Sequence, residues 1–424
     1  MAFPKGFFIG ASTAAHQVEG NNIHSDYWAM EHMEYTSFDE PSNDACDHYN
    51  RYEEDIKLLA DAGLNAYRLS IEWARIEPQP GVYDENEIKH YCKVLECCRA
   101  NFVTPIVTMH HFTSPKWLIE QGGWENEATV EKFANYCKYV VEQLGDLFTY
   151  VCTINEANMG LQIAAITKRY MQIMLKNQSA EGMVQVGVNL ENPMMERMKK
   201  QAMENVQVFG TPQPQTFVSG RTTEGDLLVM RAHQAAKKAM KEVKPELQVG
   251  ITLSLHDIQA QPGGESEAAR EWNEEFLHYL PYIQDDDFFG PQNYTRTLMG
   301  AEGSLPVPEG AETTQMGYEF YPQALGHVIR TVHESLNIPI MVTENGVATD
   351  DDTRRVAFIE EALRDVEDCI IDGIPVIGYC HWSLMDNFEW QKGYSMTFGL
   401  IAVDRATQQR SPKPSLAFLG SYAK

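Results

Sequence analysis

The chain has 424 residues, of which 43% are hydrophobic and 22% are charged, a composition that predicts a large core and excludes global disorder. Its formal net charge of −26 repels phosphate backbones and anionic lipid headgroups, so nucleic-acid and membrane partners are disfavoured. No apolar run is long enough to predict a spanning helix. The eight cysteines form no C-x-x-C pair and predict buried free thiols in a reducing cytoplasm.

Nearly continuous apolar runs rich in Val, Ile, Phe and Tyr recur along the chain, as parallel strands buried on both faces require. The first run is short, and no clear cleavage site follows it, so it predicts a strand and not a signal peptide. In chain order, the predicted strands are Phe7–Ser12, Ala66–Ser70, Val103–His110, Tyr150–Ile154, Val249–Leu255, Asp287–Asn293, Ile338–Thr343 and Val376–Trp382.

Amphipathic stretches separate these strands. Arg51–Gly63 places Ile56 and Leu59 at helical spacing and ends in a glycine suited to a helix C-terminus. Further helices are predicted at Val130–Leu144, Asp226–Val243 and Thr353–Asp372. The alternation predicts an α/β protein with a single (β/α)8 TIM barrel as one domain over residues 1–424. A doubly wound open sheet would need a Gly-rich phosphate turn after its first strand, and the sequence after Gly10 provides none.

Residues 159–225 interrupt this alternation after the fourth strand. The segment holds eight methionines between Met159 and Met203 and is longer than an ordinary connection between a strand and a helix. We interpret it as an extended loop insertion at the active-site end of the barrel, and not as a second domain.

The active site of such a barrel forms at the carboxyl ends of the strands. Polar and aromatic residues at or after these ends are Gln17, Glu19, Arg68, His110, His111, Asn155, Glu156, Gln292, Asn293, Tyr294, Glu344, Asn345, Trp382, Glu389 and Trp390. Glu156 and Glu344 end the fourth and seventh strands, on opposite sides of the ring. Glycoside cleavage needs such a pair, because one carboxyl group protonates the leaving oxygen while the other attacks, or activates water, at the anomeric carbon.

Each of these signals is weak when it is taken alone. Asn-Glu dipeptides also begin at Asn86, Asn126 and Asn273, and a Glu after a strand more often serves as a helix N-terminal charge. A histidine beside a strand is more often structural, and the tryptophans could belong to the core. The joint arrangement of two Glu with Arg, His, Tyr and Trp at one rim favours a catalytic site.

Six motifs in order along the chain resemble glycoside hydrolase family 1, the β-glucosidase family. They are FIGASTAAHQVEG from Phe8, DHYNRYEED from Asp47, YRLSIEWARIEP from Tyr67, TINE from Thr153, VTENG from Val342 and WSLMDNFEW from Trp382. The match runs nearly from end to end, and the six motifs together carry far more weight than any one of them.

Two departures from the family pattern affect the assignment of residues. The family commonly has His-Trp-Asp-Leu-Pro after the third strand, where this chain has HFTSP from His111, so His111 and not His110 is assigned as the sugar-binding histidine. After the sixth strand the usual Asn-Tyr-Tyr is replaced by QNY from Gln292. This spacing puts Tyr294 beside the nucleophile and Gln292 in the place of a sugar-facing Asn.

The resemblance implies a retaining β-glycosidase, foremost a β-glucosidase, with Glu344 as nucleophile and Glu156 as acid/base. Retention requires the two carboxyl groups to lie about 5–5.5 Å apart. Arg68 and Tyr294 are expected to hold Glu344 ionised. The implied sugar-binding residues are Gln17, His111, Asn155, Gln292, Trp382, Glu389 and Trp390. No cofactor is implied, and the histidines show no H-E-x-x-H spacing that would predict a metal site.

Three other activities remain open at this point. A 6-phospho-β-glycosidase of the same family is expected to carry Ser, Lys and Tyr phosphate ligands after the eighth strand, where this chain has Glu389 and Trp390. A thioglucosidase would lack the acid/base, and a catalytically silent sugar-binding protein would need neither carboxylate. The sequence fixes neither the sugar nor the aglycone of the β-glycoside substrate, and it leaves a homo-oligomer open.

The resemblance also gives a possible function to residues 159–225. A segment that follows the acid/base strand begins on the catalytic rim, on the leaving-group side, and methionine side chains pack against varied apolar shapes. The segment is therefore predicted to line the aglycone pocket and to favour bulky apolar aglycones. The alternative is that its methionines fill a small satellite core.

Overall fold

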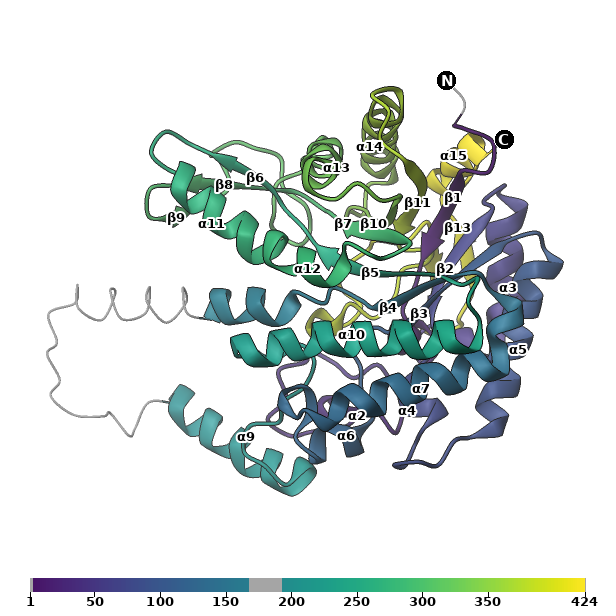
Figure 1. Cartoon of the computed structure of the whole chain (residues 1–424), viewed down its shortest axis with the longest axis vertical. Helices are drawn as coiled ribbons and strands as arrows, with labels where there is room; N and C mark the ends of the chain where they lie inside the picture. The colour runs from purple at the N-terminus through teal and green to yellow at the C-terminus, as the bar shows by residue number, and fades with distance from the viewer. Residues whose placement is uncertain (1–2, 168–192, 424) are drawn as a thin grey trace, which may run out of the picture.

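The computed structural model describes residues 3–167 and 193–423. Eight parallel strands close into a barrel in the order β1-β11-β10-β7-β5-β4-β3-β2, which confirms the predicted TIM barrel (Figure 1). Every predicted barrel strand is present, with ends shifted by at most two residues. The strands are β1 (Phe8–Ser12), β2 (Ala66–Ser70), β3 (Thr104–His110), β4 (Tyr150–Ile154), β5 (Gln248–Ser254), β7 (Phe288–Gln292), β10 (Ile340–Asn345) and β11 (Val376–Trp382).

The barrel interior is an apolar plug below a polar layer. The plug is a cluster of Ala66, Ile106, Cys152, Phe288, Met341 and Cys380, each from a different strand. Because side chains alternate along a strand, the residue two positions further on points inward again. Arg68 and Trp382 follow Ala66 and Cys380 in this way, so the strands themselves place both residues on the inner face, towards the carboxyl end of the barrel.

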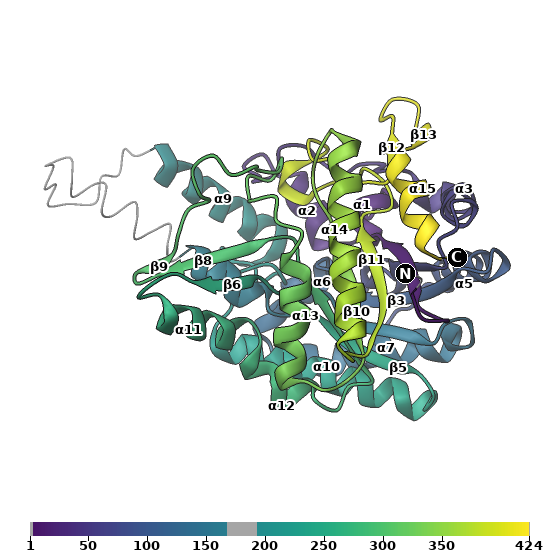
Figure 2. The ribbon, with the colours of Figure 1, turned by 90° about the horizontal axis from the view of Figure 1, so that it is seen from above.

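Helices surround the barrel on all sides (Figures 1 and 2). The four predicted helices are present, and α3 buries Ile56 and Leu59 as its pattern requires. Helix α14 begins after Asp351, whose side chain accepts a hydrogen bond from the backbone of Thr353. The longer helices are α3 (His48–Asp61), α5 (Glu85–Ala100), α7 (Ala128–Leu144), α10 (Thr223–Val243), α11 (Glu265–Glu275), α13 (Ala324–Ser335), α14 (Asp352–Ile371) and α15 (Pro414–Gly420).

Short elements extend the connections between the strands and the helices. One three-stranded sheet, in the order β6-β8-β9, comprises β6 (Asp257–Ala260), β8 (Arg296–Gly300) and β9 (Gly303–Ser304), and a hairpin comprises β12 (Ile401–Val403) and β13 (Arg410–Pro412). The short helices are α1 (Ala15–Val18), α2 (Asp26–Glu31), α4 (Trp73–Ile76), α6 (Lys116–Glu120), α12 (Leu280–Ile283), η1 (Gly123–Glu125), η2 (Gly145–Leu147), η3 (Leu277–Tyr279), η4 (Trp390–Lys392) and η5 (Ser421–Ala423).

The segment at residues 159–225 is helical over much of its described length. Residues 159–167 continue from the turn after β4 as a helix, and α9 (Pro193–Phe209) lies away from the barrel next to α6 (Figure 1). Phe209 at the end of α9 packs against Met33 and Ile119 in a small separate cluster. The methionines Met171, Met174 and Met183 lie outside the described residues.

All eight cysteines are free, and six of them are buried, in agreement with the predicted free thiols. Their burial among apolar neighbours makes them part of the packing. Within residues 3–167 and 193–423, no helix combines the length and the hydropathy that crossing a membrane demands.

Candidate active site

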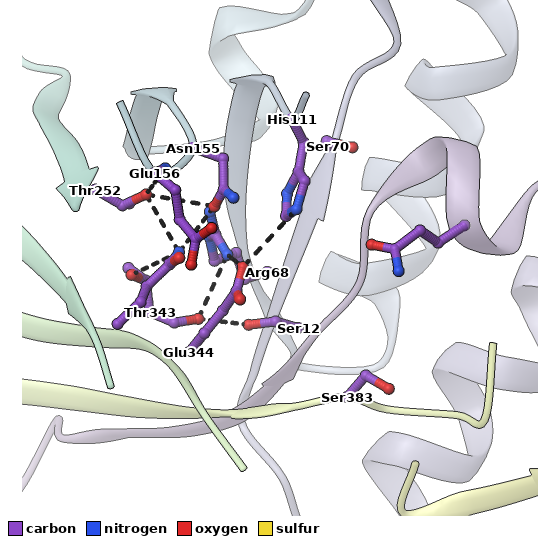
Figure 3. Close-up of polar contacts among 12 residues, drawn as sticks. Ser12, Arg68, Ser70, His111, Asn155, Glu156, Thr252, Thr343, Glu344 and Ser383 are labelled. Carbon is purple, nitrogen blue, oxygen red and sulfur yellow. Dashed lines mark hydrogen bonds and ion pairs between the residues drawn. The ribbon is translucent and has the colours of Figure 1, made fainter. Parts of the chain in front are cut away.

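A cavity of about 320 Å³ opens at the carboxyl ends of the barrel strands. Nine of the eleven predicted site residues line it: His111, Asn155, Glu156, Gln292, Tyr294, Glu344, Trp382, Glu389 and Trp390. The other two, Arg68 and Gln17, lie behind carboxylates of the lining and donate hydrogen bonds to them. In Figure 3 the side chains of Glu156 and Glu344 point into the same space from opposite sides.

Glu344 is fixed by two short hydrogen bonds. Nη1 of Arg68 donates to Oε1 at 2.6 Å, and the Tyr294 hydroxyl donates to Oε2 at 2.6 Å. The side chains of Arg68 and Glu344 are 0% and 4% exposed, so the ion pair is shielded from water. Both carboxylate oxygens are thus engaged from fixed directions, which orients the group towards the cavity.

The groups around Glu344 favour its ionised form against the effect of burial. Burial raises the pKa of Glu344, and the charge of Arg68 and the hydrogen bonds from Tyr294 and Arg68 offset part of this rise, so that the net shift is upwards. Burial lowers the pKa of Arg68, but the carboxylate of Glu344 reverses this and the net shift is upwards. Arg68 therefore keeps its charge at any working pH, and Glu344 always faces a cation.

Glu156 stands on a sharp turn directly after β4. Its φ of 44° lies in the left-handed region, which residues other than glycine rarely adopt unless neighbouring groups stabilise it. Thr252 of β5 supplies that support: its Oγ1 accepts from the Glu156 amide at 2.9 Å, and its carbonyl accepts from the Ala157 amide at 3.0 Å. The neighbouring strand therefore sets the direction in which the Glu156 side chain leaves the backbone.

The Glu156 carboxyl group has no bonded partner of the kind that Glu344 has. Within the described residues, no hydrogen bond reaches its carboxyl oxygens, and the side chain lies in the buried part of the cavity. Burial and the charge of Glu344 raise the pKa of Glu156 to about 8. The two carboxyl groups thus meet different surroundings: Arg68 and Tyr294 favour the charged form of Glu344, whereas burial and the charge of Glu344 favour the neutral form of Glu156.

A network of amide and hydroxyl groups connects the Glu344 carboxylate, through Arg68, to Thr252, which holds the backbone of Glu156. Oδ1 of Asn155 accepts from Nη2 of Arg68 at 2.6 Å and from Nε2 of Gln292 at 2.8 Å. Nε2 of Gln292 also reaches the hydroxyls of Thr252 and Thr343, at 3.2 and 3.4 Å. These bonds fix the Asn155 amide so that its oxygen faces the protein.

Several buried polar atoms at this cavity have no hydrogen-bond partner among the described residues. They are Gln17 Oε1, His111 Nδ1, Asn155 Nδ2 and Gln292 Oε1. Buried polar groups are nearly always paired, so a cluster of unpaired ones marks a place where a polar ligand or water completes the bonding. Donors and acceptors that converge on one cavity suit the hydroxyls of a sugar.

Glu389 lies in the connection after β11 with Gln17 behind it. Nε2 of Gln17 donates to the Phe388 carbonyl at 2.7 Å, to Asn387 Oδ1 at 3.1 Å and to Glu389 Oε2 at 3.4 Å. Burial and the charge of Glu344 raise the pKa of Glu389 to about 8, while hydrogen bonds from Trp382 and Gln17 act in the opposite direction. This third carboxyl group therefore lies on the side of the cavity formed by the connection after β11.

The structure brings His111, and not His110, into the cavity. The rings of Trp382 and Trp390 flank His111, with centroids 5.7 and 6.1 Å away, and its Nε2 lies 4.0 Å from Oε1 of Glu344. His110 bonds to Ser114 at 3.0 Å beneath the rim, and burial lowers its pKa to about 3. His110 is therefore a neutral structural histidine.

The sequence analysis assigned no residue to the end of the fifth strand, and two lie there. Thr252 holds the turn at Glu156, and His256, which follows β5, lines the cavity. Tyr318, from the long connection after the sixth barrel strand, is a third residue that was missed. A polar residue at a strand end could have identified Thr252 and His256, whereas Tyr318 lies too far from any strand end to give a signal.

Three of the described residues in the segment at residues 159–225 reach the cavity. Met159, Ile163 and Val218 line it on the side of Glu156. None of the α9 side chains that the structure describes lines the cavity, and Met198 and Met203 are exposed on the surface of this helix. Among the residues that the structure describes, no group of His, Cys, Asp or Glu is arranged to hold a metal ion.

A (β/α)8 barrel that carries two glutamates in contrasting surroundings, in a cavity with unpaired polar groups, is a glycosidase scaffold. The comparisons with known proteins agree with this class. The family model described as glycosyl hydrolase family 1 matches residues 1–184 and 278–424. The chain belongs to glycosyl hydrolase family 1 and is a glycoside hydrolase that acts on O-glycosyl bonds.

Curated relatives match over nearly their whole length. The β-glucosidase of Agrobacterium sp. is 30% identical, with 97% of this chain and 93% of the relative covered. The human cytosolic β-glucosidase is 28% identical, with 100% of this chain and 98% of the relative covered. The predicted resemblance to the β-glucosidase family is therefore confirmed.

Solved structures agree with these relatives. The crystal structure of β-glycosidase BGL167 has a TM-score of 0.89 and 45% identity, and covers 99% of this chain and 97% of that chain. The β-glucosidase from Thermotoga maritima in complex with castanospermine has a TM-score of 0.80 and 25% identity, and covers 99% and 98%. The predicted retaining β-glycosidase fold and class are thereby confirmed, and a 6-phosphoglycosidase or a silent binding protein is not favoured.

Proposed function

We propose that the chain is a single-domain retaining β-glucosidase in which Glu344 is the nucleophile and Glu156 is the general acid/base. The observation that carries these roles is the contrast between the two carboxyl groups. Glu344 is bonded to Arg68 and Tyr294, whereas burial and the charge of Glu344 raise the pKa of Glu156 to about 8. A nucleophile must be ionised and a general acid protonated at the same pH.

In the first step, an oxygen of Glu344 attacks the anomeric carbon of the bound glycoside. The bond from that carbon to the leaving oxygen breaks, and Glu156 transfers its proton to the leaving oxygen. The products are the free aglycone and a glycosyl ester on Glu344. Arg68 and Tyr294 already fix the orientation of the Glu344 carboxylate, so the group loses little orientational freedom when the transition state forms.

In the second step, Glu156 acts as a base. It has become a carboxylate, and it takes a proton from a water molecule that attacks the anomeric carbon of the ester. The ester bond breaks, Glu344 is released as a carboxylate, and the sugar leaves with its original anomeric configuration. Loss of the negative charge on Glu344 in the intermediate favours ionisation of Glu156, which suits its change of role.

The remaining residues are proposed to hold the sugar. Asn155 offers an unpaired amide to the 2-hydroxyl, and this contact can strengthen in the transition state. Glu389, Gln17, Gln292 and His111 would bind other hydroxyls, while Trp382 and Trp390 offer apolar faces, as residues of this kind do in sugar sites. A carboxyl group at Glu389 would disfavour a phosphorylated sugar.

Glucose as the sugar and the cytosol as the location rest on the relatives. The Agrobacterium relative is named a β-glucosidase, and the human and guinea-pig relatives are named cytosolic β-glucosidases. On the leaving-group side, Met159, Ile163 and Val218 support an aglycone pocket with apolar walls. These three residues belong to the segment that was predicted to favour bulky apolar aglycones.

A mechanism-based label tests the proposed roles. Incubation with 2-deoxy-2-fluoro-β-glucosyl fluoride should leave a stable glycosyl ester, which peptide mapping should locate on Glu344. The anomeric configuration of the first product, followed by NMR, should be β. A label on another residue or an α product would reject the mechanism, and a far better rate on galactosides or fucosides would reject glucose as the preferred sugar.

A further inference from the structure

A second cavity, of about 300 Å³, adjoins the catalytic cavity on the side of Glu156. His256, Thr295 and Tyr318 line both cavities and so form the junction between them. One wall of the second cavity belongs to β8 and to the chain around β9, and the opposite wall to helical residues 159–167. These elements project together on one side of the barrel (Figure 1).

The junction lies next to the proposed acid/base. The charge of His256 acts to lower the pKa of Glu156, and the charges of Glu389 and Glu156 raise the pKa of Tyr318, with burial the largest cause. Such mutual influence requires these groups to be close. An aglycone that leaves the anomeric carbon beside Glu156 therefore passes the junction before it reaches the second cavity.

The walls of the second cavity are largely apolar. Ala165 and Ile166 stand on one side, and Leu298, Leu305, Pro306 and Val307 on the other. Ile166, Leu305 and Val307 are 58%, 45% and 37% exposed, which is high for large aliphatic side chains gathered in one place. Exposed apolar groups that surround a cavity indicate a surface that a ligand covers.

The charged groups of the second cavity largely satisfy one another. Glu319 accepts from Arg296 at 2.9 and 2.8 Å, and the Arg296 guanidinium lies 4.0 Å from the centre of the Tyr321 ring. Glu275 accepts from Nδ1 of His256 at 2.8 Å and from its backbone amide at 3.0 Å. Groups bonded in this way offer little to the many hydroxyls of a second sugar, and the carboxylates repel an anionic aglycone.

His256 leaves one polar contact open at the junction. Its Nδ1 is held by Glu275, while its Nε2 bonds to no described residue and the side chain is 35% exposed. Residues 185–277, which include His256, lie between the two ranges that the family model matches. The junction therefore includes a residue outside the ranges that the family model matches.

We infer that the second cavity binds the far end of an elongated, uncharged aromatic aglycone, whose near end passes between His256 and Tyr318. This inference rests on the proposed β-glucosidase activity and adds to it the class of substrate. The aromatic body lies against Ile166, Leu305 and Val307, and Nε2 of His256 contacts an oxygen of the aglycone. Removal of this apolar surface from water supplies the preference.

The test compares two substrates whose leaving groups are phenols of similar acidity, so that the chemical step is alike. The ratio of kcat/KM for biphenyl-4-yl β-glucoside over phenyl β-glucoside should be at least about fivefold in the wild type. Ala165→Trp fills the cavity from the helix, and Thr297→Trp fills it from β8. Each variant should bring the ratio near one and leave the phenyl substrate within about twofold.

Ala301→Trp is the matched control, since it adds the same ring at an exposed turn beside β8 that lines neither cavity. It should leave the ratio unchanged, with melting curves confirming that all three variants fold. An unchanged ratio in both filling variants overturns the inference, as does a selective loss of cellobiose hydrolysis, which would assign the cavity to a second sugar. Failure of the wild type to hydrolyse phenyl β-glucoside at all would instead reject the proposed function.

Discussion

Glu344 and Glu156 face one cavity, but the walls that hold them are built differently. The wall around Glu344 consists mainly of strand residues, with Arg68 on β2 and Gln292 on β7, and its carboxylate takes hydrogen bonds of 2.6 Å from Arg68 and from Tyr294, which follows β7. The wall around Glu156 consists of residues that follow strands, among them Met159 and Ile163. No hydrogen bond from a described residue reaches its carboxyl group.

This difference teaches how one residue type obtains two protonation states. Burial raises the pKa of both carboxyl groups and nearby positive charges lower it, but only Glu344 also receives hydrogen bonds on its carboxylate, from Arg68 and Tyr294. The different roles of the two residues thus depend on the hydrogen bonds that Glu344 receives and, equally, on the lack of such bonds at the Glu156 carboxyl group among the described residues. Four experiments can break or sharpen the contrast.

Removal of the proton donor should give the largest effect. Glu156→Gln should slow hydrolysis of alkyl or phenyl glucosides by about 10²–10⁴-fold, because their leaving oxygens need protonation, and should spare the first step for dinitrophenyl glucosides. In the wild type, kcat/KM should fall as the pH rises through about 8, where Glu156 loses its proton, and this limb should vanish in the variant. Both are read from pH–rate profiles.

Glu274→Gln is the matched control, because Glu274 belongs to another Asn-Glu dipeptide, on the surface of α11. It should leave rates and pH profile unchanged. Equal losses on good and poor leaving groups in Glu156→Gln would contradict the role of Glu156.

Removal of Glu389 should weaken sugar binding on the other side of the cavity. Glu389→Ala should cost about 1–3 kcal/mol of transition-state binding, the loss of two hydrogen bonds of about 0.5–1.5 kcal/mol each from a carboxyl group that is largely neutral below pH 8, or roughly 5–150-fold in kcat/KM. The loss should be the same for good and poor leaving groups, unlike that in Glu156→Gln. A wild type that prefers a 6-phosphoglucoside to the plain glucoside would overturn the role assigned to Glu389.

The raised pKa of Glu156 should also affect the free energy of unfolding. The folded protein holds the proton of Glu156 up to a pH of about 8, whereas in the unfolded chain an ordinary Glu loses it near 4.3. Unfolding thus releases a proton between these values, and stability falls as the pH rises through this window. Glu156→Gln, which is neutral in both states, should be more stable at pH 8 by on the order of 2 kcal/mol.

Chemical denaturation at pH 4 and pH 8 measures this effect. The gain of Glu156→Gln over the wild type should be near zero at pH 4, where Glu156 is protonated in both states, and largest at pH 8. A gain of equal size at both values would attribute it to packing and not to the proton.

The smallest effect on activity should come from a change at Met159, one of the apolar residues that line the cavity near Glu156. Met159→Ala should lower kcat/KM for bulky apolar aglycones by about threefold to tenfold and leave methyl β-glucoside nearly unchanged, because only the former cover the side chain. Met198→Ala on the exposed surface of α9 is the control, since it changes the same residue type in the same segment. If kcat/KM fell equally for small and large aglycones, Met159 would have a purely structural role.

Much of the fold and part of the active site could be predicted from local patterns in the sequence. The apolar runs predicted all eight barrel strands, because strands buried on both faces need continuous apolar residues, and nine of the eleven site residues predicted from strand ends line the cavity. Residues after the fifth strand were missed because His256 follows its strand without any flanking motif. The helical content of the segment at residues 159–225 was missed because its length was interpreted as a loop.

The sequence by itself determined the barrel, the order of its strands and the identity of the carboxyl groups at its rim, because these follow from periodicity and from residues adjacent to strand ends. Only the tertiary structure decided what each carboxyl group experiences. Thr252 holds the turn of Glu156 from 96 positions away, and Arg68 reaches Glu344 across 276. Protonation depends on burial and on charges within a few ångströms, and no local pattern specifies which distant residues supply them.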